Sequence, residues 1–477
     1  MINRFRGNLK ANVKQIRQKG SFAQNLAITF SATAFVAVLG FAVSPIMTRL
    51  YNPQSYGLFA LFTAIVNNVN LISTLGYAPA FVLPRQRKRS IALVQLTVLL
   101  SLAALLLMSL AFWLIHDKLL RWLRAEELGV WFYVIPLAVF VFNLNVLMSA
   151  WYLRTKDFKK RAGIDVVTAV AGRSITLAVG WLGHGPAGGL LLGDLFSKFT
   201  MFFSMLFNGI HRQLGELRRP FSWSLIRAVA WEYREYPFYV MPTAYLNTLA
   251  GQLPIFFLAT GFGTTAVGLF AFSTSLLELP INLIGNAVAP VFLQKAAETY
   301  QQDPERLKQI CLNLYNKLFY LGLLPFGVIT VFGDWIFSFV FGARWEQAGV
   351  FTGYLGYYYV FKLASYATSP IYAVLQRQRI ALLGTALLVL ARAGSLVLGM
   401  RLHNLNLGML LFGLSSLIVT FLVDLNVLYL LHVPMLRVAM RTLLFVVITL
   451  GLLWGLRASL EGFLAGSFVR VASTARI

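Results

Sequence analysis

Charged side chains lie inside the apolar segments of this chain, where a charge is costly and usually faces a partner or a water-filled cavity. Three of these cations, Arg173, Arg392 and Lys362, have no opposite charge within one helical turn. Desolvated Arg and Lys bind phosphate oxygens through charge-assisted hydrogen bonds, and Arg does so with a planar fork. The residues therefore predict a cavity that binds an anionic group. Three further cations are candidates for the same site: Lys198, Lys317 and Arg49.

The apolar segments also contain a few carboxylates that could bind a coupling ion, either H⁺ or Na⁺. These coupling candidates are Glu278, Asp194 and Asp424. Glu278 is followed by a proline, and a desolvated carboxylate at such a helix break can exchange a proton. A fixed pair of Glu278 with Lys317 or Lys362 is the alternative. Asp194 and Lys198 are spaced i,i+4, so they either neutralise each other or line the cavity.

The chain contains no pattern typical of a catalytic centre. Its one cysteine excludes a disulfide framework and a multi-cysteine metal site, and its five histidines are scattered. No nucleophile motif and no cluster of metal ligands is present. We therefore predict no catalytic residues, no metal, no cofactor and no enzymatic activity.

The elements that hold these residues are membrane spans. Of the 477 residues, 58% are apolar and 12% are charged, and the mean hydropathy is +0.70. Soluble domains carry about twice that charged fraction, roughly 25%. Twelve apolar runs are each long enough to cross a bilayer of about 30 Å. These expected spans are 25–48, 57–83, 91–115, 129–153, 162–182, 187–210, 237–260, 266–292, 312–333, 348–375, 380–400 and 407–431.

The spans form two lobes of six helices in an all-α polytopic membrane protein. A further run at 442–456 is short and ends at an arginine, so it is a thirteenth span or an interfacial helix. The expected segments are a basic cytoplasmic N-terminus at 1–24, an N-terminal lobe at 25–210, a cytoplasmic linker at 211–236, a C-terminal lobe at 237–431, and a C-terminal segment at 432–477.

An internal repeat relates the two lobes. The tetrapeptide GLFA at 57–60 recurs at 268–271, and an Ala-Pro pair follows each copy at the same distance. Arg173 and Arg392 occupy equivalent positions in a second echo, which also includes His184 and His403. Each lobe has an even number of spans, so the repeat is parallel, with its axis along the membrane normal. Duplicated lobes are the architecture of transporters, with the substrate path between them.

Positive charge is distributed by loop. Lys and Arg fill the N-terminus and alternate loops, whereas the turns at 184–186 and 261–265 contain neither. Because cytoplasmic loops accumulate Lys and Arg, the N-terminus is predicted to be cytoplasmic. The net charge of +24 is explained by this distribution and by contact with anionic lipid headgroups. We therefore predict no nucleic-acid partner.

Three segments resemble a known family. PIMTRLYNPQSYGLFAL at 45–61 resembles the junction between the first two spans of bacterial O-antigen and polysaccharide flippases. These proteins belong to the multidrug/oligosaccharidyl-lipid/polysaccharide exporter superfamily. FGARWEQAG at 341–349 resembles their loop between spans nine and ten, and the segment at 369–379 is similar to the part of those proteins after that loop. The resemblance covers about residues 25–431.

The resemblance implies a function. Its substrate would be an undecaprenyl-pyrophosphate-linked oligosaccharide, flipped from the cytoplasmic to the periplasmic leaflet of the inner membrane by alternating access. It would serve O-antigen (lipopolysaccharide) or other surface polysaccharide synthesis, alongside a polysaccharide polymerase and a chain-length regulator. Aromatic rings stack on sugars, so Tyr354, Tyr357 and Tyr358 are sugar-contact candidates; aromatic residues that only pack helices are the alternative.

Two other functions are possible for such a chain. A multidrug exporter of the same superfamily would have more carboxylates than cations in its cavity, and here the balance is reversed. A membrane polysaccharide polymerase or glycosyltransferase would need a large extramembrane loop or catalytic carboxylates and arginines within one. The longest internal loop is the basic stretch at 211–236. The sequence therefore favours the transporter.

Overall fold

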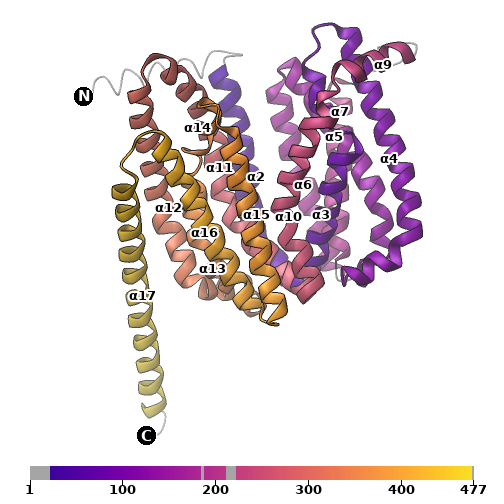
Figure 1. Cartoon of the computed structure of the whole chain (residues 1–477). Coiled ribbons are helices and arrows are strands. Elements are labelled where there is room, and N and C mark those ends of the chain that lie inside the picture. Colours follow the sequence, from indigo (N-terminus) through magenta and orange to yellow (C-terminus); the bar gives the residue numbers. More distant parts are fainter. Residues whose placement is uncertain (1–21, 184–186, 211–221, 475–477) are drawn as a thin grey trace. The chain divides into compact units, whose positions relative to one another are not determined.

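The computed structural model describes residues 22–183, 187–210 and 222–474, and it contains helices and no strands in these ranges. The turn expected at 184–186 and the first part of the linker at 211–236 lie outside the described residues, as does nearly all of the N-terminal segment. By its internal contacts the chain divides into two units, Met1–Gly268 and Leu269–Ile477. Figure 1 shows the helices of each unit. The all-α polytopic class expected from the sequence is confirmed.

Unit 1 contains the described helices of the first lobe and three helices beyond it, α9, η4 and α10. Its helices are α2 (Phe22–Leu50), α3 (Pro53–Ser73), η1 (Ala78–Val82), α4 (Arg87–Trp122), η2 (Glu126–Val134), α5 (Ile135–Thr155), α6 (Phe158–Trp181), α7 (Gly188–Phe207), α9 (Trp223–Glu232), η4 (Tyr236–Val240) and α10 (Met241–Phe262). The sequence assigns α10 to the second lobe, but its contacts group it with unit 1. Asn68 of α3 donates to Gln252 of α10 at 3.1 Å, and such hydrogen bonds hold helices together in lipid.

Unit 2 contains the second lobe without α10, and the C-terminal helix. Its helices are α11 (Thr264–Gln302, of which the first residues belong to unit 1), α12 (Pro304–Phe341), η5 (Ala343–Trp345), α13 (Glu346–Ala364), α14 (Ser369–Val374), α15 (Gln378–Arg401), α16 (Leu405–Leu430) and α17 (Met435–Thr474). α12 and α16 pack on α13, most of whose residues are buried. α13 is therefore the central helix of unit 2.

Eleven of the described helices are long and apolar enough to span a membrane. The spans expected at 237–260 and 348–375 are not among these eleven. α10 forms at the first position, but its Asn and Gln residues lower its hydropathy. α13 ends at Ala364, short of the expected 375, and is rich in Gly and Tyr. The run at 442–456 is longer than expected, because the apolar part of α17 extends over Met435–Gly462 and has the length of a full span.

The repeated GLFA motif begins two helices that touch each other. A Cβ on Gly57 of α3 would lie 1.7 Å from the carbonyl oxygen of Thr264. A Cβ on Gly268 of α11 would lie 1.7 Å from the carbonyl oxygen of Pro53. The two contacts are equivalent in the repeat, and only glycine allows the backbones to approach so closely. The glycines of the two copies thus lie in close backbone contact within unit 1.

Each unit also has a tight hairpin at the position of the second echo. In unit 1, a Cβ on Gly189 of α7 would lie 3.3 Å from the backbone nitrogen of Gly180 of α6. In unit 2, a Cβ on Gly399 of α15 would lie 2.6 Å from Cα of Gly408 of α16. The two hairpins follow the same plan, which agrees with the duplication read from the sequence.

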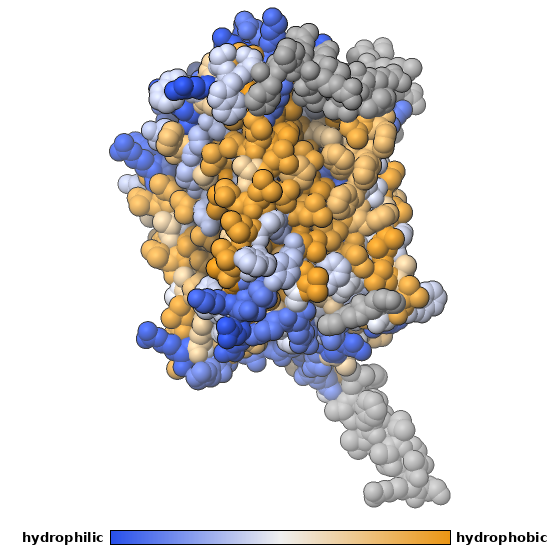
Figure 2. Space-filling view, turned by 90° about the vertical axis from the view of Figure 1, so that its right-hand side faces the viewer, coloured by the Kyte–Doolittle hydropathy of each residue, from blue (hydrophilic) through white to orange (hydrophobic). Residues whose placement is uncertain are grey.

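The surface is consistent with a bilayer environment. Figure 2 shows a broad band of apolar side chains with polar side chains at its two ends. On α4, large apolar side chains are exposed over successive turns: Leu102, Leu106, Leu107, Leu110, Trp113 and Leu114. Such a surface would be unstable in water and is stable against lipid chains.

Candidate functional site

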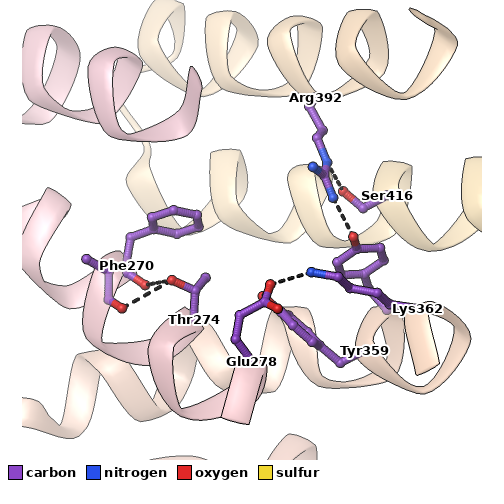
Figure 3. Close-up of polar contacts among 9 residues, drawn as sticks. Phe270, Thr274, Glu278, Tyr359, Lys362, Arg392 and Ser416 are labelled. Carbon is purple, nitrogen blue, oxygen red and sulfur yellow. Dashed lines mark hydrogen bonds and ion pairs between the residues drawn. The ribbon is translucent and has the colours of Figure 1, made fainter. Parts of the chain in front are cut away.

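An ion pair between two helices lies in unit 2. α11 carries Glu278, and Pro280 interrupts its backbone bonding one half-turn later. α13 carries Lys362, whose Nζ is paired with Oε1 of Glu278. Oη of Tyr359 donates to the same carboxylate oxygen at 3.1 Å (Figure 3). Each side chain of the pair is still 31% exposed, so both ions remain accessible to a ligand.

Arg392 of α15 lies beside this pair and is held without a carboxylate. Its Nε donates to Oγ of Ser416 at 2.9 Å, and its Nη2 donates to Oη of Tyr358 at 2.7 Å (Figure 3). Its guanidinium carbon lies 5.2 Å from the ring centre of Tyr358 and 5.0 Å from that of Phe412. Among the described residues, none forms an ion pair with Arg392. Its positive charge is therefore not neutralised within the unit.

These residues form one continuous cluster. Tyr358 and Tyr359 are neighbours on α13, with ring centres 5.1 Å apart, and they connect Arg392 to the Glu278 pair. Two cations and one carboxylate leave a net charge of one positive. A guanidinium has five N–H donors, and two of those of Arg392 are used by Ser416 and Tyr358. The cluster can therefore bind an anion through its remaining donors.

The cluster contains no catalytic arrangement. The carboxylate is paired with a lysine, and no hydroxyl or thiol is hydrogen-bonded to a histidine in it. In the parts of the chain that the structure describes, no three His, Cys, Asp or Glu side chains gather as metal ligands.

In unit 1, Arg173 of α6 has carbonyl partners. Its Nη1 donates to the carbonyl oxygen of Ala169 at 3.3 Å, and its Nη2 donates to that of Val36 in α2 at 3.4 Å. A Cβ on Gly40 of α2 would lie 2.6 Å from Nη2, so the glycine makes room for the guanidinium. Asp165 is paired with Arg161 instead. Arg173 is thus a second cation with no carboxylate among the described residues.

The remaining charged candidates have separate environments. Lys198 and Asp194 form the i,i+4 pair that was one of the two alternatives for them, and the backbone oxygen of Lys198 accepts from Asn145 at 2.9 Å. Lys317 and Arg49 are exposed at the surface. Of the two lysines that could pair with Glu278, Lys362 does so and Lys317 lies apart.

The three tyrosines proposed to contact sugar differ in exposure. Tyr357 and Tyr358 are buried, and Tyr354 is half-buried. Oη of Tyr358 is occupied by Arg392. Of the three, Tyr354 therefore has the most accessible ring.

The sequence did not point to Ser416 or Phe412. Their residue types are common in apolar helices, and only the pairing of α15 with α16 brings them to Arg392. Tyr359 belongs to a run of three tyrosines, and its role as a donor to Glu278 depends on how α13 is rotated against α11.

The chain is similar in sequence to proteins of polysaccharide biosynthesis. A family model described as "Polysaccharide biosynthesis protein" matches residues 46–349. The succinoglycan biosynthesis transport protein ExoT of Rhizobium meliloti (strain 1021) is 21% identical over 317 residues. This alignment covers 66% of the chain and 62% of ExoT, so the chain spans less than two thirds of that relative.

Two solved structures share the fold. The lipid II flippase MurJ, in an inward closed conformation, superposes with a TM-score of 0.68 at 13% identity, covering 90% of this chain and 92% of that one. An inward-facing multidrug resistance MATE family transporter of the MOP superfamily superposes with a TM-score of 0.61 at 16% identity, covering 88% and 97%. At these identities the likeness shows the fold alone.

Proposed function

The chain belongs to the family of polysaccharide biosynthesis proteins, and from this premise we propose that it transports a lipid-linked oligosaccharide across the bacterial inner membrane. The substrate would be an undecaprenyl-pyrophosphate-linked repeat unit, moved from the cytoplasmic to the periplasmic leaflet. A diphosphate and hydrophilic sugars do not cross hydrocarbon unaided, so a protein must supply a polar path. The name of the relative in sequence, a succinoglycan biosynthesis transport protein, supports this substrate class.

The observation that carries the proposal is the net positive cluster around Arg392. Glu278 offsets one of its two cations, and the second positive charge is available to an anion. An exporter of cationic drugs would be expected to have the opposite balance, with carboxylates in excess. The charge therefore favours an anionic headgroup, and a pyrophosphate matches the guanidinium fork.

The two alternative functions receive less support. The likeness to a multidrug transporter extends to the fold and says nothing about cargo. A polymerase or glycosyltransferase would need a large loop outside the membrane, and the described residues between the helices form only short connections.

We further propose that Arg173 supplies a second cation for the headgroup, from the first repeat. Its partners are carbonyl oxygens, so its full charge is retained. The equivalence of Arg173 and Arg392 in the repeat supports a clamp on one pyrophosphate.

The proposal is tested by measuring surface polysaccharide and membrane protein level together in cells. Arg392→Ala removes a charge-assisted contact worth about 1.5 to 3 kcal/mol, which corresponds to a loss of roughly ten- to a hundredfold in binding. We expect little surface polysaccharide at an unchanged protein level, and partial rescue by Arg392→Lys. Arg401→Ala, an exposed arginine at the end of the same helix, is the control and should behave as wild type.

Three outcomes would contradict the proposal. Normal polysaccharide in Arg392→Ala, Lys362→Ala and Arg173→Ala would exclude the cationic site. Loss of protein together with polysaccharide in all three would mean that these residues only hold the fold. Drug resistance that falls in the same variants, with polysaccharide unaffected, would instead support the multidrug exporter.

A further inference from the structure

A buried carboxylate lies apart from the anion site, at the end of the same central helix. Asp424 of α16 is completely buried. Its carboxylate accepts from Oγ of Ser365 at 2.9 and 3.0 Å and from Oγ1 of Thr368. Both hydroxyls belong to the turn between α13, which ends at Ala364, and α14, which begins at Ser369. The carboxylate thus contacts the break at the end of α13.

No cation balances this carboxylate. In the described ranges, no Lys, Arg or His lies within ion-pair distance of Asp424. The titratable groups that face it are neutral in their usual state: Cys311 and Tyr315 of α12, and Tyr372 of α14. Arg441 of α17 lies beside Tyr315, but its guanidinium donates to Asn316. An unpaired buried carboxylate avoids the high cost of its charge by taking up a proton.

The hydroxyls of Ser365 and Thr368 can form hydrogen bonds with Asp424 whether its carboxyl group is ionised or protonated. Oγ of Ser365 is within reach of the carbonyl oxygen of Phe361, at 2.9 Å, as well as of the carboxylate. Oγ1 of Thr368 is likewise 3.2 Å from the carbonyl oxygen of Ser365. A hydroxyl has one proton to donate, so each must choose between its carbonyl and Asp424.

Both choices leave every group satisfied. When Asp424 is ionised, both hydroxyls donate to it, and the carbonyls keep their backbone donors: Ser365 N–H for Phe361, and Ser369 N–H for Ser365, each at 2.9 Å. When Asp424 is protonated, its O–H donates to Oγ of Ser365, whose own hydroxyl turns back to the carbonyl oxygen of Phe361, and Oγ1 of Thr368 continues to donate to the other carboxyl oxygen. A network with two complete arrangements can change state without stranding a buried polar group.

We propose that Asp424 is a proton-binding site whose occupancy sets the hydrogen bonding of the turn after α13. The proton comes from water and returns to it, and no other bond is made or broken. The site is assigned to a proton and not to Na⁺, because Asp424 is completely buried and Oγ of Ser365 lies in direct contact with its two carboxylate oxygens, at 2.9 and 3.0 Å, which leaves no space for a cation between them. Glu278, the other coupling candidate of this unit, is already paired with Lys362.

The site has a consequence for transport, which rests on the proposed function. Lys362, Tyr359 and Tyr358 lie on the last two turns of α13, directly before the turn that holds Asp424. A change in that turn therefore acts on the helix that carries the anion site. Proton binding at Asp424 would couple the pH of the adjacent compartment to the release or capture of the headgroup.

The direct test is infrared difference spectroscopy of the purified protein in lipid, titrated with acid. A protonated carboxyl has a C=O stretching band that an ionised one lacks. We expect such a band in the wild type near neutral pH and its disappearance in Asp424→Asn, which keeps the size and the hydrogen-bonding reach of the side chain. Asp303→Asn is the matched control, because Asp303 is an exposed N-cap that asparagine can replace.

A second variant tests the proposal even if Asp424→Asn misfolds. Ser365→Ala removes one hydroxyl partner and should shift the frequency of the band without abolishing it. If the wild type and Asp424→Asn give the same spectra at every pH, or if Ser365→Ala leaves the frequency unchanged, the proposal is wrong. Loss of the band on adding Na⁺ at constant pH would also overturn it, since the site would then hold sodium.

The spectra are independent of transport, so they separate the two proposals. A band that depends on Asp424 in a protein that moves no oligosaccharide would refute the proposed function and leave the proton site intact. In transport assays, the wild type should respond to pH and Asp424→Asn should not. Transport by Asp424→Asn with an unchanged pH response would refute the coupling.

Discussion

Replacement of Gly268 by alanine should destabilise the protein, because Gly268 of α11 makes a close backbone contact with α3. An ordinary glycine-to-alanine replacement within a helix is stabilising. Alanine at Gly268 would place its Cβ 1.7 Å from the carbonyl oxygen of Pro53 and 2.7 Å from the nitrogen of Gly57. Both neighbours are backbone atoms, which cannot turn aside as a side chain can. The two helices must therefore separate, and their packing is lost.

The magnitude depends on two opposing effects. Replacing glycine by alanine within a helix gains about 1 kcal/mol of intrinsic stability. Overpacking a tight contact costs typically about 1 to 3 kcal/mol, and occasionally more. Because this overlap is with backbone, we expect the upper part of that range and a net destabilisation of roughly 1 to 2 kcal/mol for Gly268→Ala.

Gly251→Ala is the matched control. Gly251 lies in α10 of the same unit, and a Cβ there would meet no atom within 4 Å. It should show the gain alone and stabilise the protein. The double variant with alanine at Gly57 and Gly268 should lose less stability than the sum of the two single variants, because one separation of the two backbones removes both overlaps.

Thermal unfolding of the purified variants in one detergent, followed by far-UV circular dichroism, measures these differences. The expected order of midpoints is Gly251→Ala above wild type, and wild type above Gly268→Ala. A Gly268→Ala protein as stable as Gly251→Ala would refute the reasoning, and with it the close backbone contact between Gly57 and Gly268.

Three further predictions concern the C-terminal helix, the topology and the ion pair. Arg457→Ala removes two hydrogen bonds to a carboxylate of α12, at 2.9 and 2.7 Å, so α17 should become open to limited proteolysis while the rest of the chain resists. Thr265→Cys should react with an impermeant thiol reagent from the periplasm and Arg85→Cys should not; the reverse would overturn the predicted orientation. Glu278→Gln leaves Lys362 unpaired, so the headgroup should bind more tightly and be released more slowly, with the pH response of transport intact. If the pH response of transport is lost in Glu278→Gln, Glu278 and not Asp424 binds the coupling proton.

The sequence predicted most of the helices, because long apolar runs are a local signal. The starts expected at 57 and 312 are later than the true ones, although each helix has a local cap: Asn52 for α3 and Asp303 for α12, each followed by a proline at the first helical position. The span at 348–375 was predicted too long, because α13 ends at Ala364 and a second helix begins at Ser369, where Pro370 is a local signal for a break. The contact of the intervening turn with Asp424, 56 residues away from Thr368, has no local signal.

The site was predicted in part. Arg392 and Lys362 stand out as charges in apolar helices, and a charge in a span is visible without a structure. The partner of Lys362 is 84 residues away in the chain, and the sequence did not decide whether Glu278 pairs with Lys317 or with Lys362. Ser416 has no signal at all, because a serine in a span is ordinary until a neighbouring helix brings a guanidinium to it.

The central claim is tested most directly by reconstitution. The purified protein is placed in liposomes that contain a polyprenyl-pyrophosphate-linked oligosaccharide, and a membrane-impermeant glycosidase reports which headgroups reach the outer leaflet. The account predicts that wild-type protein exposes the inner-leaflet headgroups, and that Arg392→Ala does so roughly ten- to a hundredfold more slowly. Headgroups that remain as protected with wild-type protein as in empty liposomes would contradict it.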